Sequence, residues 1–373
     1  MGDWSYVNTD GLGLLEYLYL CEDFKMDPIM GVWSGYALAS GGSSIPVADL
    51  GPYIQQAIDQ INFAIGDPAE SAPAALRASL GHPEPFKLTY VEIGNEDFIG
   101  SAPSTYAGRW NTIVTNLTAT FPNLRFIATS RTSGPLLSPT PQHYDVHVYQ
   151  TPNWLQTNSF FYDGFERNGT TYFEGEYAGI STNSSNLFGS PAQGRLLFPT
   201  VRSAVGEAAF MTGLERNSDI VFAAAYAPLL QHVNGSQWTP NLVSFDASTV
   251  YRSTSFYAQK LFATNQGDEY IPSTLPTASG TLFWSISRKV SSNELIFKIS
   301  NNAANASDIT FVLPFKNVAV SGIAQVLTGP TTASNTPETP GVVVPTTLTV
   351  KTGLTFNYTA PALSVTVLRV KAH

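Results

Sequence analysis

The chain has 373 residues, of which 43% are apolar and only 13% are charged, and its formal net charge is −9. This composition is typical of a loop-rich globular protein and excludes a disordered chain. The acidic balance argues against a nucleic-acid or anionic-membrane partner, because no basic stripe is present to replace phosphate counterions. A single cysteine, Cys21, excludes a disulfide framework.

The first two thirds of the chain alternate predicted strands with predicted helices. Strand followed by helix, repeated, indicates a parallel sheet with right-handed crossovers, and a barrel is the expected closure. Asp10 and Ser104 are the expected N-caps of two helices, and the Pro- and Ala-rich segment after residue 65 is expected to be a loop. Helices are predicted near 14–21, 49–65, 104–117, 154–167, 200–214 and 253–265, and strands near 28–33, 88–96, 124–130, 143–150, 171–179 and 219–228.

After Gly267 the pattern changes to short Thr-, Val- and Phe-rich runs separated by Gly, Pro and Asn turns. Such runs carry no helical period and are typical of an antiparallel β-sandwich. We therefore predict two domains, a β/α barrel portion over residues 1–267 and a β-sandwich over residues 268–373.

Two predicted strands each bring a glutamate to the carboxyl end of the sheet. The run YVEIGNEDF (90–98) carries Asn95 and Glu96, and TYFEGEYAG (171–179) carries Glu176. Catalytic side chains of barrel enzymes lie at these strand ends, and two such carboxylates are the minimum for hydrolysis of a glycosidic bond. Glu174 points to the same side as Glu176 and is the alternative nucleophile, although one pleat deeper, where a hydroxyl or cation partner is expected.

The strand HYDVHVYQ (143–150) places Asp145, His147 and Tyr149 on one face. His147 and Tyr149 lie nearest the strand end and are candidate substrate-site residues, whereas Asp145 is expected to be structural. Trp4 and Trp154 lie in predicted loops, where an aromatic ring either stacks on a sugar or packs in the core.

The sequence predicts neither a metal nor a cofactor. The five histidines form no His-x-x-x-His pair, and no Cys pair, acidic calcium loop, phosphate loop or serine elbow is present. N-glycosylation sequons are frequent, which favours a secreted, extracellular glycoprotein. They begin at Asn116, Asn168, Asn183, Asn234, Asn305 and Asn357.

The motifs YVEIGNEDF, GEYA and D-x-H-x-Y, with the opening GDWSYVNTDGLGLLEYL, together resemble family 51 of the glycoside hydrolases, specifically the fungal α-L-arabinofuranosidases. The resemblance extends from the first residues to at least Asn265. It implies that Glu96 is the general acid/base, that Glu176 is the nucleophile, and that Tyr149 orients Glu176. It further implies that Asn95 contacts the sugar and that His147 contacts either the acid/base region or the sugar.

The resemblance also implies a (β/α)8 barrel with the acid/base on strand four and the nucleophile on strand seven. Counting back from Glu176, the chain supplies strands three to eight and leaves strands one and two unassigned. A six-stranded barrel would have two open edges. We therefore expect an upstream fragment of the same protein to complete the barrel.

The sequence thus predicts a retaining, exo-acting α-L-arabinofuranosidase that removes arabinose side chains from arabinoxylan or arabinan. An endo-glucanase or xylanase built on the same barrel is an alternative within the enzyme class. A catalytically incomplete sugar-binding fragment, which needs the upstream part for turnover, is the alternative outside it.

Overall fold

The computed structural model describes residues 7, 9, 11–38 and 42–373. The chain divides into two compact units, one of residues 1–146 with 167–173, the other of residues 147–166 with 174–373. The strands β6 (His143–Gln150) and β7 (Thr171–Gly179) begin in the first unit and end in the second. Both have the bounds expected from the sequence. The division into domains at residue 267 stays a prediction.

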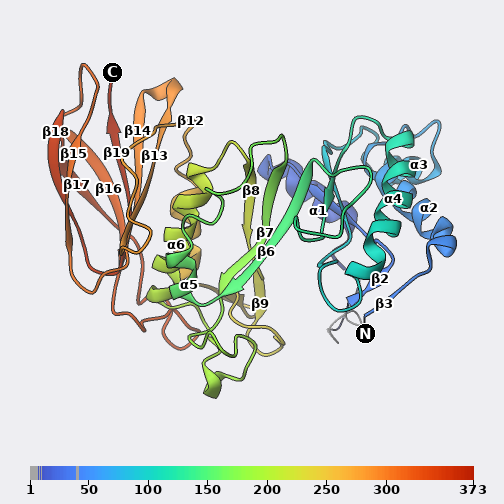
Figure 1. Ribbon diagram of the computed structural model, residues 1–373, viewed down its shortest axis with the longest axis horizontal. Helices are drawn as coiled ribbons and strands as arrows, with labels where there is room; N and C mark the ends of the chain where they lie inside the picture. Colours follow the sequence, from blue (N-terminus) through green and yellow to red (C-terminus); the bar gives the residue numbers. More distant parts are fainter. Residues whose placement is uncertain (1–6, 8, 10, 39–41) are drawn as a thin grey trace. The chain divides into compact units, whose positions relative to one another are not determined.

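The first unit contains a parallel β/α pattern (Figure 1). Its helices bury one face each, and α2 does so with Ile54, Ala57, Ile61 and Ala64. The elements that lie wholly in this unit are α1 (Leu14–Phe24), β1 (Ile29–Val32), β2 (Tyr36–Ala37), β3 (Ser43–Ser44), η3 (Val47–Asp49), α2 (Gly51–Ile65), α3 (Ala72–Ser79), β4 (Tyr90–Ile93), α4 (Pro103–Thr120) and β5 (Arg125–Ala128).

Two expectations for this unit are wrong. The segment expected as a loop after residue 65 contains α3, which begins after Ser71, whose hydroxyl accepts a hydrogen bond from Ala74 N. The helix α4 begins one residue before Ser104, and Ala102 occupies its N-cap. Ser104 instead lies in the first turn and donates its hydroxyl to Ser101 O. Asp10, the other expected cap, lies outside the described residues.

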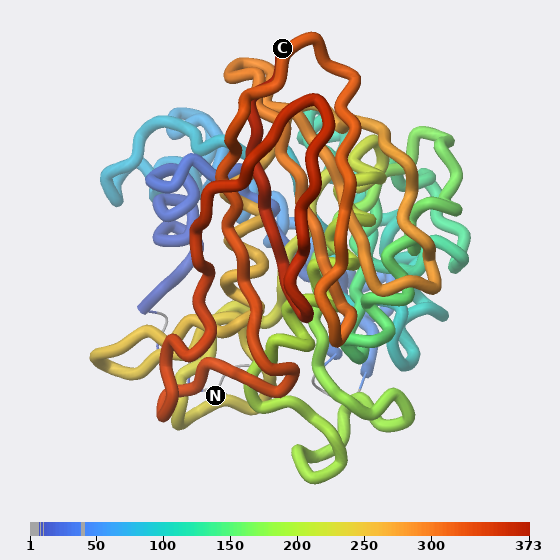
Figure 2. The backbone as a smooth tube through the Cα atoms, turned by 90° about the vertical axis from the view of Figure 1, so that its left-hand side faces the viewer, coloured from blue at the N-terminus to red at the C-terminus, as the bar shows by residue number. Residues whose placement is uncertain are grey.

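The second unit contains the ends of β6 and β7, three α-helices, two short 3-10 helices and the C-terminal sheets. Figure 2 shows the strands of the C-terminal part running side by side. Its elements are α5 (Pro152–Thr157), η4 (Pro191–Gln193), α6 (Val201–Arg216), β8 (Val221–Tyr226), β9 (Leu230–His232), β10 (Val243–Phe245), β11 (Val250–Arg252), α7 (Thr254–Ala263), β12 (Glu269–Tyr270), β13 (Leu282–Lys289), η5 (Val290–Ser292), β14 (Glu294–Asn301), β15 (Ser307–Val312), β16 (Ser321–Thr328), β17 (Thr346–Lys351), β18 (Thr355–Ala360) and β19 (Ser364–Lys371).

The sheet topology confirms the expected fold class. Six strands form the parallel sheet in the order β1-β4-β5-β6-β7-β8, and the C-terminal strands form an antiparallel sheet in the order β12-β13-β14-β19-β16-β17, with β15 pairing β18. A small sheet of β9, β10 and β11 was not expected from the sequence. No helix among the described residues is both long and apolar enough to cross a membrane.

The helix α6 is the central element of the second unit. It packs against α5, α7 and β8 and also against β13, β14 and β19 of the C-terminal sheet. Because it is covered on all sides, its buried residues run without a break from Ser203 to Leu214. A Cβ at Gly206 would lie 2.4 Å from Pro152 O, and one at Gly213 would lie 1.9 Å from Ser159 O. The close approach of α5 and of the segment after it therefore requires glycine at both positions.

Candidate active site

The candidate acid/base Glu96 lies in a tight turn directly after β4. Its φ is +52°, in the left-handed region that non-glycine residues rarely adopt. Gly94, two residues earlier, has φ +100°, and a Cβ there would lie 2.1 Å from Asp97 Oδ2. Asn95 between them is exposed. A conformation this uncommon persists only where surrounding contacts impose it.

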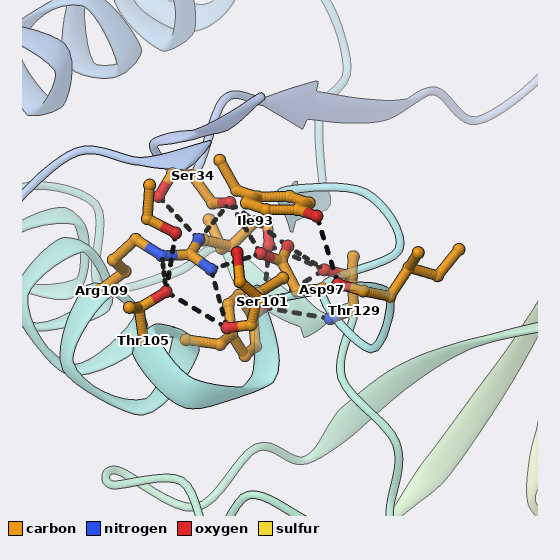
Figure 3. Close-up of polar contacts among 12 residues, drawn as sticks. Ser34, Ile93, Asp97, Ser101, Thr105, Arg109 and Thr129 are labelled. Carbon is orange, nitrogen blue, oxygen red and sulfur yellow. Dashed lines mark hydrogen bonds and ion pairs between the residues drawn. The ribbon is translucent and has the colours of Figure 1, made fainter. Parts of the chain in front are cut away.

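A fully buried ion pair provides those contacts (Figure 3). Arg109 Nη2 lies 2.7 Å from Asp97 Oδ1, and both side chains have 0% exposure. Arg109 also donates to Ser34 O and Ser34 Oγ, at 3.0 and 2.8 Å. Thr129 Oγ1 donates to Asp97 Oδ2 at 2.7 Å. Residue 97 is therefore fixed by groups from the segment after β1, from α4 and from the end of β5.

The tyrosine of this network joins β4 to β5. Tyr106 Oη donates to Ile93 O at 2.8 Å and accepts from Thr129 N at 3.0 Å. Burial, together with the charge of Asp97, raises the pKa of Tyr106 far above its usual range, so the phenol stays neutral. Burial also raises the pKa of Asp97, and Arg109, Thr129 and Ser34 oppose this rise. The ends of the two strands are thus held by the same side chains.

In the second unit, three predicted residues meet at the ends of β6 and β7. Tyr149 Oη donates to Glu176 Oε2 at 2.6 Å, and His147 Nδ1 lies 3.4 Å from the same oxygen. The His147 side chain is only 3% exposed, whereas that of Glu176 is 31% exposed. A short bond from a phenol to a carboxylate is a charge-assisted bond that fixes the carboxylate orientation. Glu176 is thus both oriented and accessible.

The competing glutamate has a different environment. Glu174 is 0% exposed and accepts a hydrogen bond from Tyr162 Oη, the kind of hydroxyl partner expected for a buried residue at this position. A sealed carboxylate cannot reach a sugar. The arrangement therefore favours Glu176 over Glu174 as the nucleophile.

An aromatic group beside Tyr149 was missed by the sequence reasoning. The ring of Trp238 lies 4.9 Å from that of Tyr149, and the Arg195 guanidinium lies 4.4 Å over the Trp238 ring. Phe188 lies 5.8 Å from Trp238 and is 65% exposed. Burial lowers the pKa of Arg195. The signal available in the sequence was weak, because Trp238 and Arg195 lie in loops without a motif.

The two remaining predicted residues are tryptophans. Trp154 lies on α5, where its ring packs against Phe161 at 6.1 Å and Phe210 at 6.3 Å. Of the two alternatives for this ring, core packing and sugar stacking, these contacts favour core packing. Trp4 lies outside the described residues. A pair of carboxylates is the equipment that hydrolysis of a glycosidic bond requires. The absence of a metal and of a cofactor stays a prediction.

A β/α sheet with an oriented, accessible carboxylate at a strand end and a second carboxylate in a constrained turn after another strand is the construction of a glycoside hydrolase. The sequence matches the α-L-arabinofuranosidase 1 domain over residues 1–167 and the α-L-arabinofuranosidase C-terminal domain over residues 175–364. The chain therefore belongs to glycoside hydrolase family 51, the family of the α-L-arabinofuranosidases.

Individual relatives agree with this assignment. The probable α-L-arabinofuranosidases A of Aspergillus flavus and Aspergillus terreus are 39% and 38% identical, over 98% of this chain and 56% of each relative. An arabinose-bound family 51 α-L-arabinofuranosidase structure is 66% identical with a TM-score of 0.98, over 100% of this chain and 59% of that one. The Thermotoga maritima α-L-arabinofuranosidase shares the fold at 16% identity, with a TM-score of 0.77 over 98% of this chain and 80% of that one.

The chain thus spans just over half the length of the curated relatives it matches. Its fold class is a portion of a (β/α)8 barrel followed by a β-sandwich. That an upstream segment supplies further strands stays a prediction.

Proposed function

We propose that this chain is part of a retaining, exo-acting α-L-arabinofuranosidase that removes terminal arabinofuranosyl groups from arabinoxylan or arabinan. The observation that carries the proposal is the bond from Tyr149 Oη to the half-exposed carboxylate of Glu176, within a family 51 chain. The binding of arabinose by the 66% identical family member supports the same sugar here.

In the first step, Glu176 Oε attacks the anomeric carbon and the bond to the leaving oxygen breaks, while Glu96 gives that oxygen its proton. In the second step, Glu96 takes a proton from water, and the water oxygen displaces Glu176 with net retention. This chemistry requires the two carboxyl groups about 5–5.5 Å apart across one furanose ring. Tyr149 and His147 hold the attacking carboxylate, and Asn95 binds the sugar 2-hydroxyl.

The first test uses the complete natural protein and three substrates. We expect turnover of 4-nitrophenyl α-L-arabinofuranoside, and release of free arabinose from arabinoxylan, well above the activity on an aryl xyloside or β-glucan. Methanol as acceptor should give methyl α-L-arabinofuranoside, the retained anomer. Turnover of glucan or xyloside without arabinofuranoside turnover would instead identify the endo-acting alternative.

The roles of the two carboxylates are separated by azide. With Glu176→Gly, azide fills the space of the nucleophile and should give the inverted β-arabinofuranosyl azide. With Glu96→Ala and a nitrophenyl substrate, azide should attack the covalent intermediate and give the α-azide. Glu174→Gly is the matched control on the same strand, and restoration of its activity by azide would move the nucleophile to Glu174.

We also propose that the natural protein is secreted and N-glycosylated. Asn183 is half-buried, and the other sequon asparagines are exposed, so most acceptor side chains are accessible. Endoglycosidase treatment of protein from its natural source should lower its mass. An unchanged mass would exclude the glycans.

A further inference from the structure

Glu207 is a buried carboxyl group in the middle of α6, between apolar and small residues. Its side chain is 0% exposed. Burial raises its pKa from 4.5 to about 8, so the carboxyl group is protonated under mildly acidic and neutral conditions. None of the roles proposed above for the catalytic residues uses this group. A buried acid kept neutral in this way needs a structural or functional reason.

One oxygen of Glu207 binds the strand that carries the nucleophile. Gly179 N, at the last residue of β7 and three residues after Glu176, donates to Glu207 Oε1 at 3.1 Å. A Cβ at Gly179 would lie 3.4 Å from this oxygen and 3.2 Å from Pro152 Cγ. The strand end therefore lies directly against α6, and Glu207 fixes the point at which β7 stops.

The other oxygen faces a polar cluster. Three buried oxygens have no hydrogen-bond partner of standard geometry among the described residues. They are Glu207 Oε2, Tyr226 Oη of β8 and Ser255 Oγ of α7. Ser255 nevertheless lies near enough to lower the pKa of Glu207, although no bond of standard geometry joins them. Buried hydroxyls of this kind retain partners, and ordered water is the usual bridge.

Tyr226 couples this cluster to the candidate site. Tyr226 belongs to a buried cluster with Ala178 and Ile180 of the β7 end, and Tyr149 packs against this cluster. The charge of an ionised Glu207 would raise the pKa of Tyr226, which agrees with their proximity. Two further titratable groups lie on β7, Tyr177 and Glu174. The charges of Glu207 and Glu174 both raise the pKa of Tyr177. All these groups are acids. Ionisation of Glu207 would therefore add an unpaired negative charge among them.

We propose that Glu207 is a positioning residue for the nucleophile, which holds the end of β7 through Gly179 beside the cluster of Tyr226 on which Tyr149 packs. The inference rests on the proposed function, because it assigns Glu207 a part in the same glycosyl transfer. Loss of the proton should displace α6 from β7, since a buried carboxylate without a cation has to attract water or move.

The pH dependence of turnover tests the protonated state. Glu96→Ala removes the acid/base from the titration, and a dinitrophenyl arabinofuranoside needs no proton on its leaving group. In this background, kcat/KM should fall at least tenfold as the pH rises past about 8, where Glu207 ionises. Adding Glu207→Gln, which keeps both hydrogen-bonding positions without a charge, should retain at least a third of kcat/KM at low pH and abolish the fall.

A matched control lies two turns further along the same helix. Glu215 pairs with Lys298 of the sandwich, and its side chain is 28% exposed. Glu215→Gln should leave the alkaline fall unchanged. If the fall persists in the Glu207→Gln variant, or disappears equally in the Glu215→Gln variant, the proposal is overturned.

Amide exchange at Gly179 gives a readout that does not need turnover. We expect slow exchange in the wild type and in Glu207→Gln, and exchange at least tenfold faster in Glu207→Ala. If the complete protein is inactive on arabinofuranosides while this exchange pattern holds, the proposed function fails, but Glu207 still holds the end of β7 through Gly179. Equal exchange in the wild type and in Glu207→Ala would show that the bond from Gly179 to Glu207 does not hold the strand end. If Glu207→Ala does not fold, the pH profile of Glu207→Gln carries the test.

Discussion

Replacement of Asp97 by alanine should strongly destabilise the first compact unit. Asp97 and Arg109 have 0% exposure, and their nearest charged atoms are 2.7 Å apart. Removal of the carboxylate leaves the Arg109 guanidinium buried, with its remaining bonds to Ser34, Thr105 and Ala102, all to neutral oxygens. A neutral oxygen cannot compensate a full charge in this environment.

Loss of one partner from a buried ion pair costs about 3–5 kcal/mol. Thr129 Oγ1, which donates to Asp97 at 2.7 Å, and Ser34 Oγ lose an acceptor at the same time. We therefore expect a loss of at least 3 kcal/mol, roughly the lower limit for such a pair. Because Asp97 also follows the left-handed residue Glu96, kcat should fall together with stability.

Urea unfolding of the complete protein, followed by tryptophan fluorescence, measures the change in unfolding free energy. Asp27→Ala is the control, because the Asp27–Lys87 pair is 63% and 70% exposed and should contribute little. The double variant Asp97→Ala, Arg109→Met should recover part of the loss, since it removes the orphaned charge. A loss below about 1 kcal/mol for Asp97→Ala, or no recovery in the double variant, would contradict this account of the pair.

Three further predictions concern the second unit. Tyr149→Phe removes the 2.6 Å bond to Glu176 and should lower kcat by about 10- to 100-fold with little change in KM, as expected for a bond to a charged group; a kcat within twofold of wild type would exclude this role. Trp238→Ala should lower kcat by about 3- to 10-fold through misplacement of the Tyr149 ring, and steady-state kinetics on an aryl arabinofuranoside would detect it. The third prediction concerns Glu207, whose pKa is about 8 in the folded protein and 4.5 in an unfolded chain. Between these pH values the unfolded chain has already lost the proton and the folded protein has not, so the free energy of unfolding falls as the pH rises. Glu207→Gln has no such group to ionise. The difference in unfolding free energy between the wild type and this variant should therefore change by up to about 5 kcal/mol across that pH range. Unfolding free energies that follow the same pH dependence in both proteins would refute the prediction.

Elements with a strong period were predictable from the sequence. The strands β6 and β7 have the expected bounds, and α2 (Gly51–Ile65) lies close to the expected 49–65. The helix α3 was missed because its eight residues are too few to show a helical period and its Pro and Ala content favoured a loop. The strands β9, β10 and β11, each of three residues, carry even less local signal and form through pairing with one another.

Residues of the candidate site were predictable from the sequence only where they lie at the end of a regular strand. Glu176 with Tyr149 was found because alternation fixes which side chains share a face. Arg109 is itself a signal in the sequence, because a cation between the apolar residues Tyr106 and Trp110 on a helix implies a buried carboxylate partner. Its partner, Asp97, could not be found by periodicity, because the pair joins a turn to a helix through tertiary contact.

The two candidate catalytic glutamates are supported by opposite electrostatic means. Glu96 lies in a strained turn, and the neighbouring Asp97 is fixed by a buried ion pair with Arg109. The pair can hold an unfavourable backbone conformation, because separating the two buried charges would cost more free energy than the strain. Glu176 lies in a regular strand that needs no such constraint, and the α6 carboxyl group that binds the end of this strand at Gly179 is kept neutral. A fixed positive charge near Glu176 would weaken it as a nucleophile, since a carboxylate already paired with a cation attacks carbon less readily. The phenol of Tyr149, a donor without a charge of its own, orients the nucleophile without neutralising it, and the carboxyl group of Glu207 binds the end of the same strand.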